Sequence, residues 1–373
     1  MPQTTTRESH RRSKYLPAIH CGRSSFRSYR PHPLQAGYIL IGIIAMMTVA
    51  LSALLVAAVD PNTLRNNKER RNNHVLAVAR QALIGRAVAD NNRPGSLPCP
   101  DLNNDGILAV GVDIIGNNCT TYIGRLPWRT LGMGDLRDAD GERLWYALAP
   151  NFRDATGVSI NDATAATLSV TGTVSVSNVT AMVFTPGAAL NGQSRDTVGN
   201  QNNVINYLDG VNALGGPSFA MQAIDTGFND RSTAITVSDL MTAVERRVAN
   251  EIAVALNGYF QANSVLPRPA LASDSSCAPG GNAALCLPDG SSTTGLLPRN
   301  LSPGVGWPGV TFPPWLDSTW RTSLIYTVSP DCTSIPACAG QAFGLTPAVA
   351  GSAPKVTLTI GTTTSLTVPY FAQ

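Results

Sequence analysis

An uninterrupted apolar run near the start of the chain constrains its fold more than any other feature. Residues 38–59 read YILIGIIAMMTVALSALLVAAV and contain no charge. At a rise of about 1.5 Å per residue, a helix of this length spans the roughly 30 Å hydrocarbon core of a bilayer. A secretory signal peptide has a shorter apolar region followed by a cleavage site. The run therefore predicts an uncleaved transmembrane helix over residues 38–59, after a basic leader over residues 1–37.

Charge is unevenly distributed, although the net charge is only +3. Residues 1–36 carry seven Lys/Arg and one Glu, whereas the rest of the chain has 20 Lys/Arg and 23 Asp/Glu. A mildly acidic body argues against a nucleic-acid partner, which would need a basic footprint. Six cysteines of the body occur at short spacings, as disulfides do in oxidising compartments. We therefore predict a single-pass protein of the bacterial inner membrane, with its amino terminus in the cytoplasm and its body in the periplasm.

The cysteine spacing also predicts which residues pair. Cys277 and Cys286 are nine residues apart in a Gly/Pro/Asn-rich stretch, and Cys332 and Cys338 are six apart around Pro336. Each pair can bring its Cα atoms within the distance that a disulfide requires. Cys99 and Cys119 bracket a polar loop. We expect disulfides Cys99–Cys119, Cys277–Cys286 and Cys332–Cys338.

The rest of the chain predicts an α+β fold with a long amino-terminal helix and a β-rich body. An amphipathic helix is expected over residues 60–92, because Leu76, Ala79, Leu83 and Ala87 recur at helical spacing. A first β-rich unit covers residues 93–235, with strands within 165–186 and mostly loop over 187–235. A second unit covers residues 236–373. It begins with a helix capped by Thr236 and Asp239 and ends in a hairpin around Gly361.

The two units contain matching segments in the same order, which predicts a degenerate helix-plus-β repeat. Each pair lies 169 to 180 residues apart in the sequence. The pairs are residues 97–100 with 266–269 (LPCP and LPRP), 124–127 with 295–298 (GRLP and GLLP), and 144–150 with 324–330 (LWYALAP and LIYTVSP).

One polar loop resembles the first half of a calcium-binding loop. Asp101, Asn103 and Asp105 supply oxygen side chains at positions 1, 3 and 5, and Gly106 follows. The distal glutamate is missing, and Asp113 is the nearest carboxylate that could replace it. Calcium is thus a candidate ligand, and no other cofactor is expected. The alternative is a turn whose side chains cap their own backbone.

Catalytic chemistry is not expected. All four histidines lie before residue 75, so the body has no imidazole for a Ser–His–Asp site or a zinc centre. Glu142, Glu245 and Glu251 are not spaced as an acid–base pair. We therefore predict that the chain is not an enzyme.

The amino-terminal third resembles type IV pilins and type II secretion pseudopilins. The features that carry the resemblance are a basic leader, the junction Gly37–Tyr38, about 20 apolar residues, a proline at Pro61 and an amphipathic helix entering a β domain. The stretch from Leu97 to Tyr146, with LPCPD, GRLPWRTLG and GERLWYA, is also similar to a group of proteobacterial prepilin-like proteins. The resemblance covers residues 37–150 well and 180–330 loosely.

The resemblance implies a function in assembly. Prepilin peptidase would cleave between Gly37 and Tyr38, and the apolar helix would pack with those of other pilin subunits. Pilins usually carry glutamate at mature position 5, where this chain has Gly42, which implies a minor, low-copy or tip subunit. The alternative function is a binding or adhesion module in the periplasm, held by the same amino-terminal helix.

Overall fold

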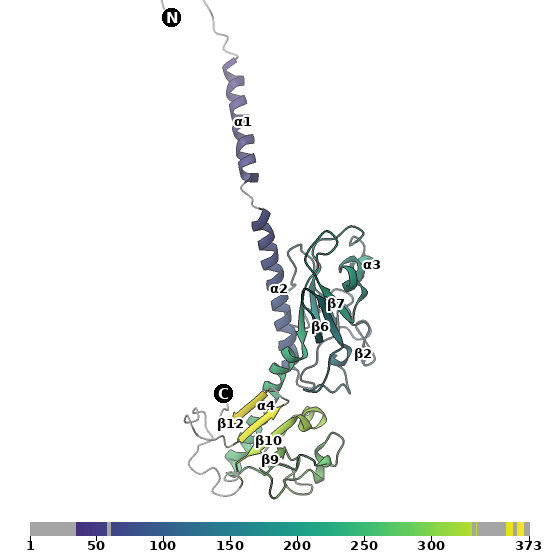
Figure 1. Cartoon of the computed structure of the whole chain (residues 1–373), viewed down its shortest axis with the longest axis vertical. Helices are drawn as coiled ribbons and strands as arrows, with labels where there is room; N and C mark the ends of the chain where they lie inside the picture. The colour runs from purple at the N-terminus through teal and green to yellow at the C-terminus, as the bar shows by residue number, and fades with distance from the viewer. Residues whose placement is uncertain (1–34, 58–60, 330–332, 334–355, 361–363, 369–373) are drawn as a thin grey trace, which may run out of the picture. The chain divides into compact units, whose positions relative to one another are not determined.

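The computed structural model describes residues 35–57, 61–329, 333, 356–360 and 364–368 (Figure 1). The chain divides into two compact units, residues 1–61 and 62–373. Each unit is described separately.

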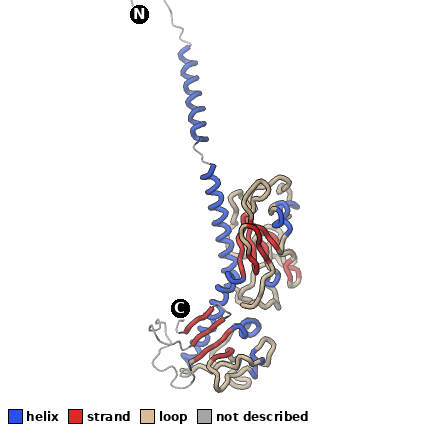
Figure 2. The backbone as a smooth tube through the Cα atoms, in the orientation of Figure 1, coloured by secondary structure: helices blue, strands red, loops and turns tan. Residues whose placement is uncertain are grey.

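The first unit contains one long helix, α1 (Gln35–Ala57), shown as an uninterrupted coil in Figure 2. Across the described residues, no helix combines the length and the apolar character needed to cross a membrane. The prediction of a transmembrane helix over residues 38–59 was therefore wrong. Residues 58 and 59 of the apolar run lie outside the described residues.

The second unit begins with α2 (Pro61–Ala89), which lies beside a six-stranded sheet. Leu76, Ala79, Leu83 and Ala87, the residues predicted to share one helix face, are all buried in the core. The strands follow the order β3-β4-β6-β5-β7, and β8 pairs with β6. Their bounds are β3 (Ile123–Arg125), β4 (Trp145–Leu148), β5 (Leu168–Gly172), β6 (Val176–Thr185), β7 (Ser218–Met221) and β8 (Arg231–Thr236).

Helix α4 (Val237–Asn263) follows β8 directly and packs against a second sheet. Its start is the capping box predicted from Thr236 and Asp239, with both reciprocal hydrogen bonds present. The second sheet is antiparallel, in the order β12-β11-β10-β9. Its strands are β9 (Thr294–Leu296), β10 (Leu324–Val328), β11 (Val356–Ile360) and β12 (Thr364–Val368), the last two forming the predicted hairpin.

The matched sequence segments occupy equivalent places in the two sheets. Gly124 of β3 pairs with Tyr146 of β4, and Gly295 of β9 pairs with Tyr326 of β10. The second strand of each pair also pairs antiparallel with a third strand: β4 with β6, and β10 with β11. The two halves of the body thus share one strand order, β3-β4-β6-β8 and β9-β10-β11-β12.

Two side-chain contacts recur at the same positions. The hydroxyl of Tyr146 donates to the carbonyl of Pro98 at 3.1 Å, and that of Tyr326 donates to the carbonyl of Pro267 at 2.9 Å. Neither Gly124 nor Gly295 has room for a methyl group. A Cβ on Gly124 would lie 2.9 Å from Pro100 Cβ, and one on Gly295 would lie 2.0 Å from the carbonyl oxygen of Ala270. The segment LPxP therefore crosses over the glycine of the paired strand in each half.

The stretch over residues 187–235 has more structure than the predicted loop. It contains β7, β8 and the short helix α3 (Val198–Gln201). Strand β8 reads RSTAIT and buries only Ile235, so its sequence lacks the alternating apolar signal. The described fold also contains a two-stranded ribbon, β1 (Ile114–Ile115) and β2 (Asn118–Cys119). Seven short helical turns complete it, at residues 150–152, 204–206, 210–214, 275–277, 283–285, 316–320 and 321–323.

Candidate functional site

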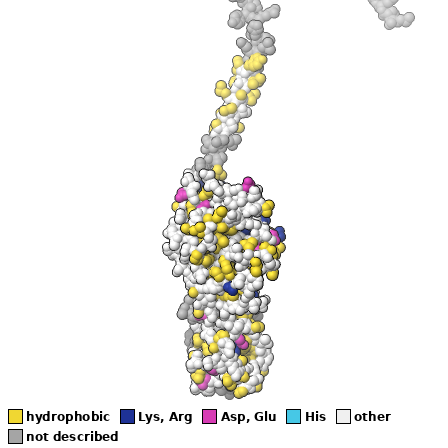
Figure 3. All heavy atoms as spheres, turned by 90° about the vertical axis from the view of Figure 1, so that its right-hand side faces the viewer, with side chains coloured by type: hydrophobic (Ala, Val, Ile, Leu, Met, Phe, Trp, Pro, Cys, Tyr) yellow, Lys and Arg dark blue, Asp and Glu magenta, His cyan; other side chains and the backbone are white. Residues whose placement is uncertain are grey.

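The residues predicted to act in assembly all lie on α1. Gly37 and Tyr38 are within the helix, and Tyr38 is 75% exposed. Every side chain described on α1, from residue 38 to 54, is exposed. Gly42 has no atom within 4 Å of the position that a Cβ would take. Figure 3 shows hydrophobic side chains along this helix. An apolar surface of this extent is typical of a protein or membrane contact.

The predicted calcium loop is organised around its own backbone. Asp101 accepts hydrogen bonds from the amides of Asn103, Asn104 and Gly106, and Asp113 accepts from those of Leu102 and Ala109. Asp105 accepts from Ile107 N at 2.7 Å and from the Asn103 side chain. Within the described residues, no three His, Cys, Asp or Glu side chains gather as they would around a metal ion. The loop has the geometry of the alternative, an Asx-rich turn.

Two of the predicted disulfides are present. Cys99–Cys119 joins the LPCP segment to β2, and Cys277–Cys286 closes a loop of the second half. Cys332 and Cys338 lie outside the described residues. Neither bond involves a strand of the six-stranded or the four-stranded sheet.

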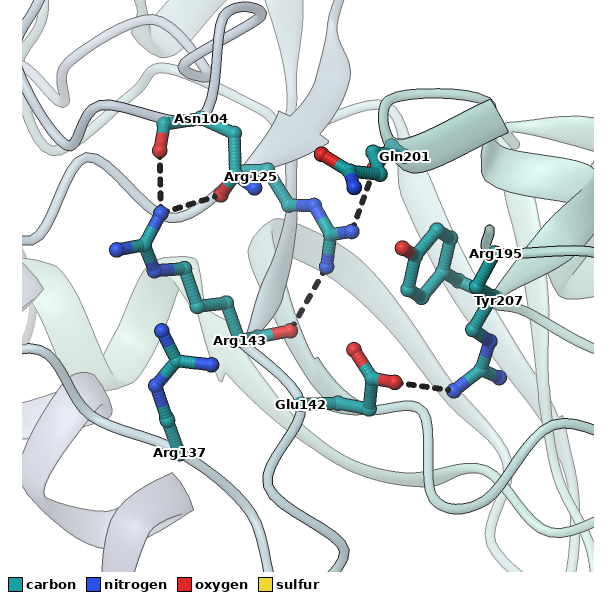
Figure 4. Close-up of a pocket in the computed structure, with 8 residues that line it drawn as sticks. All are labelled: Asn104, Arg125, Arg137, Glu142, Arg143, Arg195, Gln201 and Tyr207. Carbon is teal, nitrogen blue, oxygen red and sulfur yellow. Dashed lines mark hydrogen bonds and ion pairs between the residues drawn. The ribbon is translucent and has the colours of Figure 1, made fainter. Parts of the chain in front are cut away.

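A polar pocket of about 340 Å³ lies in the first half of the body (Figure 4). Its lining brings four arginines together: Arg125 from β3, Arg137 and Arg143 from the turn before β4, and Arg195 from the loop after β6. Glu142 is the carboxylate of the lining, and Arg195 lies 3.1 Å from it. Arg137 and Arg143 both form ion pairs with Asp135.

Arg125 differs from the other three arginines because it is buried and has no ion pair with any residue that the structure describes. It is 3% exposed, and its Nη atoms donate to the backbone carbonyls of Arg143 and Gln201 at 3.0 and 2.6 Å. Its Nε has no hydrogen-bond partner. The guanidinium lies over the rings of Tyr207 and Trp145, at 3.9 and 4.5 Å from their centroids. Burial lowers the pKa of Arg125 to about 10, because desolvation disfavours its charge.

The sequence did not predict this pocket. Its residues are separated by as many as 103 positions, from Asn104 to Tyr207, and no motif links them. The β3–β4 register, which pairs Arg125 with Trp145, and the loop that carries Tyr207 bring them together. One signal was available. Arg125 interrupts an otherwise apolar GRLPW segment whose counterpart reads GLLPR.

Comparison with family models, with curated proteins and with solved structures found no match for this chain.

Proposed function

We propose that the chain is a pilin- or pseudopilin-like subunit that acts by assembly. The observation that carries this proposal is the exposed, uncharged surface of α1. Removing apolar surface from water is worth about 25 cal/mol per Å², so a helix with this surface gains stability when a partner covers it. The partner proposed is the equivalent helix of neighbouring subunits, and the β-rich body would lie on the outside or the tip of the filament.

The amino-terminal junction supports processing before assembly. In the resemblance to prepilins, cleavage falls between Gly37 and Tyr38 and leaves Tyr38 as the first residue. The two disulfides support a body that matures in an oxidising compartment, such as the periplasm.

Gly42 supports a low-copy place in the filament. At mature position 5 it supplies no carboxylate to neutralise the amino terminus of the subunit ahead. A first or tip subunit has no subunit ahead and loses nothing. A glycine also allows a neighbouring helix to approach closely, as small residues do between apolar helices.

Processing is tested first by intact-mass analysis of the chain expressed with and without a prepilin peptidase. A mature chain that begins at Tyr38 only when the peptidase is present supports the proposal. A chain that still begins at Met1 in cells with an active peptidase contradicts it.

Copy number is tested by quantitative proteomics of sheared filaments. We expect far fewer copies of this chain than of the main subunit, and restoring the carboxylate with Gly42→Glu should raise its share. Equal stoichiometry in the unmodified chain would overturn the argument from Gly42. Absence from filaments, together with retained ligand binding by the body, would favour the alternative of a binding or adhesion module.

A further inference from the structure

The starting point is a buried guanidinium that has no direct ion pair among the described residues. Arg125 is 97% buried, donates to two backbone carbonyls through its Nη atoms, and makes no ion pair in the described part of the chain. Removing an ion from water carries a large penalty even after the surroundings relax. A carboxylate is the usual partner for a guanidinium buried in this way.

The aromatic rings offset only part of this penalty. Tyr207 and Trp145 lie within cation–π distance of the Arg125 guanidinium. A desolvated cation–π contact stabilises a buried cation without accepting a hydrogen bond from it. These contacts hold the guanidinium in place but leave its Nε–H without an acceptor.

The repeated half of the body shows that the fold does not need an arginine here. Arg125 pairs with Trp145 and forms a bridge with Asp101, and its counterpart Leu296 forms the equivalent bridge with Ala270. Leu296 is 4% exposed and lies in an apolar cluster. The same sheet position is therefore compatible with a leucine. Replacing a buried ion by an apolar residue is often neutral or stabilising, so the charge at Arg125 calls for a reason other than stability.

The pocket around Arg125 points to an anion as that reason. Arg143 and Arg195 contribute further positive charge, and Asn104 and Gln201 add amide groups to the lining (Figure 4). Both Arg125 and Arg195 lie over the Tyr207 ring, at 3.9 and 4.4 Å, so the ring has little face left to stack on a ligand. Recognition must therefore come from charge and hydrogen bonds.

We propose that this pocket binds a small organic carboxylate, held by the guanidinium of Arg125 and the amides of Asn104 and Gln201. A volume of about 340 Å³ lies at the small end of ligand pockets and suits a molecule the size of a sugar acid. Glu142 lines the site as well, so a singly charged, planar carboxylate fits it better than a phosphate dianion. The proposal does not depend on filament assembly.

The test is isothermal titration calorimetry of the full chain with three probes: glucuronate, glucose and inorganic phosphate. We expect glucuronate to bind, glucose not to bind, and phosphate to bind more weakly than glucuronate. No binding of glucuronate, or tighter binding of phosphate, would overturn the proposal. Equal binding of glucose and glucuronate would show that the charge is not recognised and would also overturn it.

Variants locate the binding. Arg125→Lys keeps a positive charge but removes Nε and the planar fork, and should weaken glucuronate binding at least about tenfold. Gln201 is exposed, and the variant Gln201→Ala keeps the backbone carbonyl that accepts from Arg125, so it should fold normally. It should weaken glucuronate binding about two- to fivefold. Arg268→Lys and Gln222→Ala, both outside the pocket, are the matched controls. Unchanged affinity in Gln201→Ala and in a folded Arg125→Lys would place any binding elsewhere and refute the assignment.

Discussion

A buried carboxylate pair in the first half of the body makes the stability of the protein depend on pH. Asp230 is 3% exposed and accepts hydrogen bonds from Asp209 N at 2.8 Å and Asn212 Nδ2 at 3.0 Å, both on its Oδ2. Its Oδ1 is buried without a partner. Desolvation, followed by the negative charge of Asp209, raises the pKa of Asp230 to about 8 from 3.8.

The sign of the effect follows from proton counting. Between pH 3.8 and about 8, Asp230 is protonated in the folded state and ionised in the unfolded state. The folded state therefore binds more protons, and stability falls as the pH rises through this interval. A pKa difference of one corresponds to about 1.4 kcal/mol, so the wild type should lose at most about 4 kcal/mol through this group between pH 5 and pH 9.

The substitution Asp230→Asn removes this loss. The Asn side chain keeps an oxygen for the Asp209 amide and for Asn212, and it carries no charge at any pH. We expect the variant to be close to wild type at pH 5 and more stable at pH 9. Urea unfolding at pH 5 and pH 9 gives the free energy of unfolding of each protein. The test is whether the difference between Asp230→Asn and wild type increases with pH.

Asp225→Asn is the matched control, because Asp225 is exposed. Its effect should be the same at both pH values. If the difference between wild type and Asp230→Asn did not grow from pH 5 to pH 9, Asp230 would not be protonated in the folded state. The argument from its burial would then fail.

Three further predictions concern the repeat and the disulfide. Gly295→Ala should destabilise the protein by about 3 kcal/mol and Gly124→Ala by about 1 to 2, because the closer contact of the first is with backbone; urea unfolding should show no change for Gly134→Ala, whose added Cβ meets nothing within 4 Å. Tyr146→Phe and Tyr326→Phe should each cost about 1 kcal/mol, since each leaves a proline carbonyl without its donor. An effect in only one of them would argue against equivalent contacts. Replacing Cys99 and Cys119 by Ala should lower the free energy of unfolding by about 3 kcal/mol, because the unfolded chain gains the entropy of an open loop of 20 residues. Reductant should not destabilise this variant further through the Cys99–Cys119 bond, which it lacks.

Local patterns explain which parts of the fold could be predicted. The α4 cap depends on Thr236 and Asp239, three residues apart, and its buried face repeats at four-residue steps, so both are readable from sequence. The hairpin at 356–368 alternates apolar and polar residues around a glycine. Cys277–Cys286 closes a loop of nine residues, which limits the alternatives.

Non-local contacts explain what could not be predicted. Strand β8 is held by pairing to β6 and by α2 rather than by its own pattern; Arg80 of α2, for example, donates to the carbonyl of Ala234 at 3.3 Å. The acidic loop was ambiguous because Asp101 and Asp113 are suited both to a cation and to amides, and only the backbone path decides between them. The arginine pocket combines residues from β3, the turn before β4 and two later loops, which no spacing rule connects.

Comparison of the two halves of the body shows which residues both sheets share and which residue occurs in only one of them. Both halves keep the glycine under the LPxP segment and the tyrosine that bonds to it, because without them the crossing backbone has neither space nor a donor. At the next residue the halves diverge, with Arg125 in one and Leu296 in the other, although both positions are buried. The leucine adds to the apolar core, and the arginine costs desolvation and opens onto a pocket with three more arginines. A residue that the fold can replace by leucine, and that has no ion pair among the described residues, is better explained by what enters the pocket than by the packing around it.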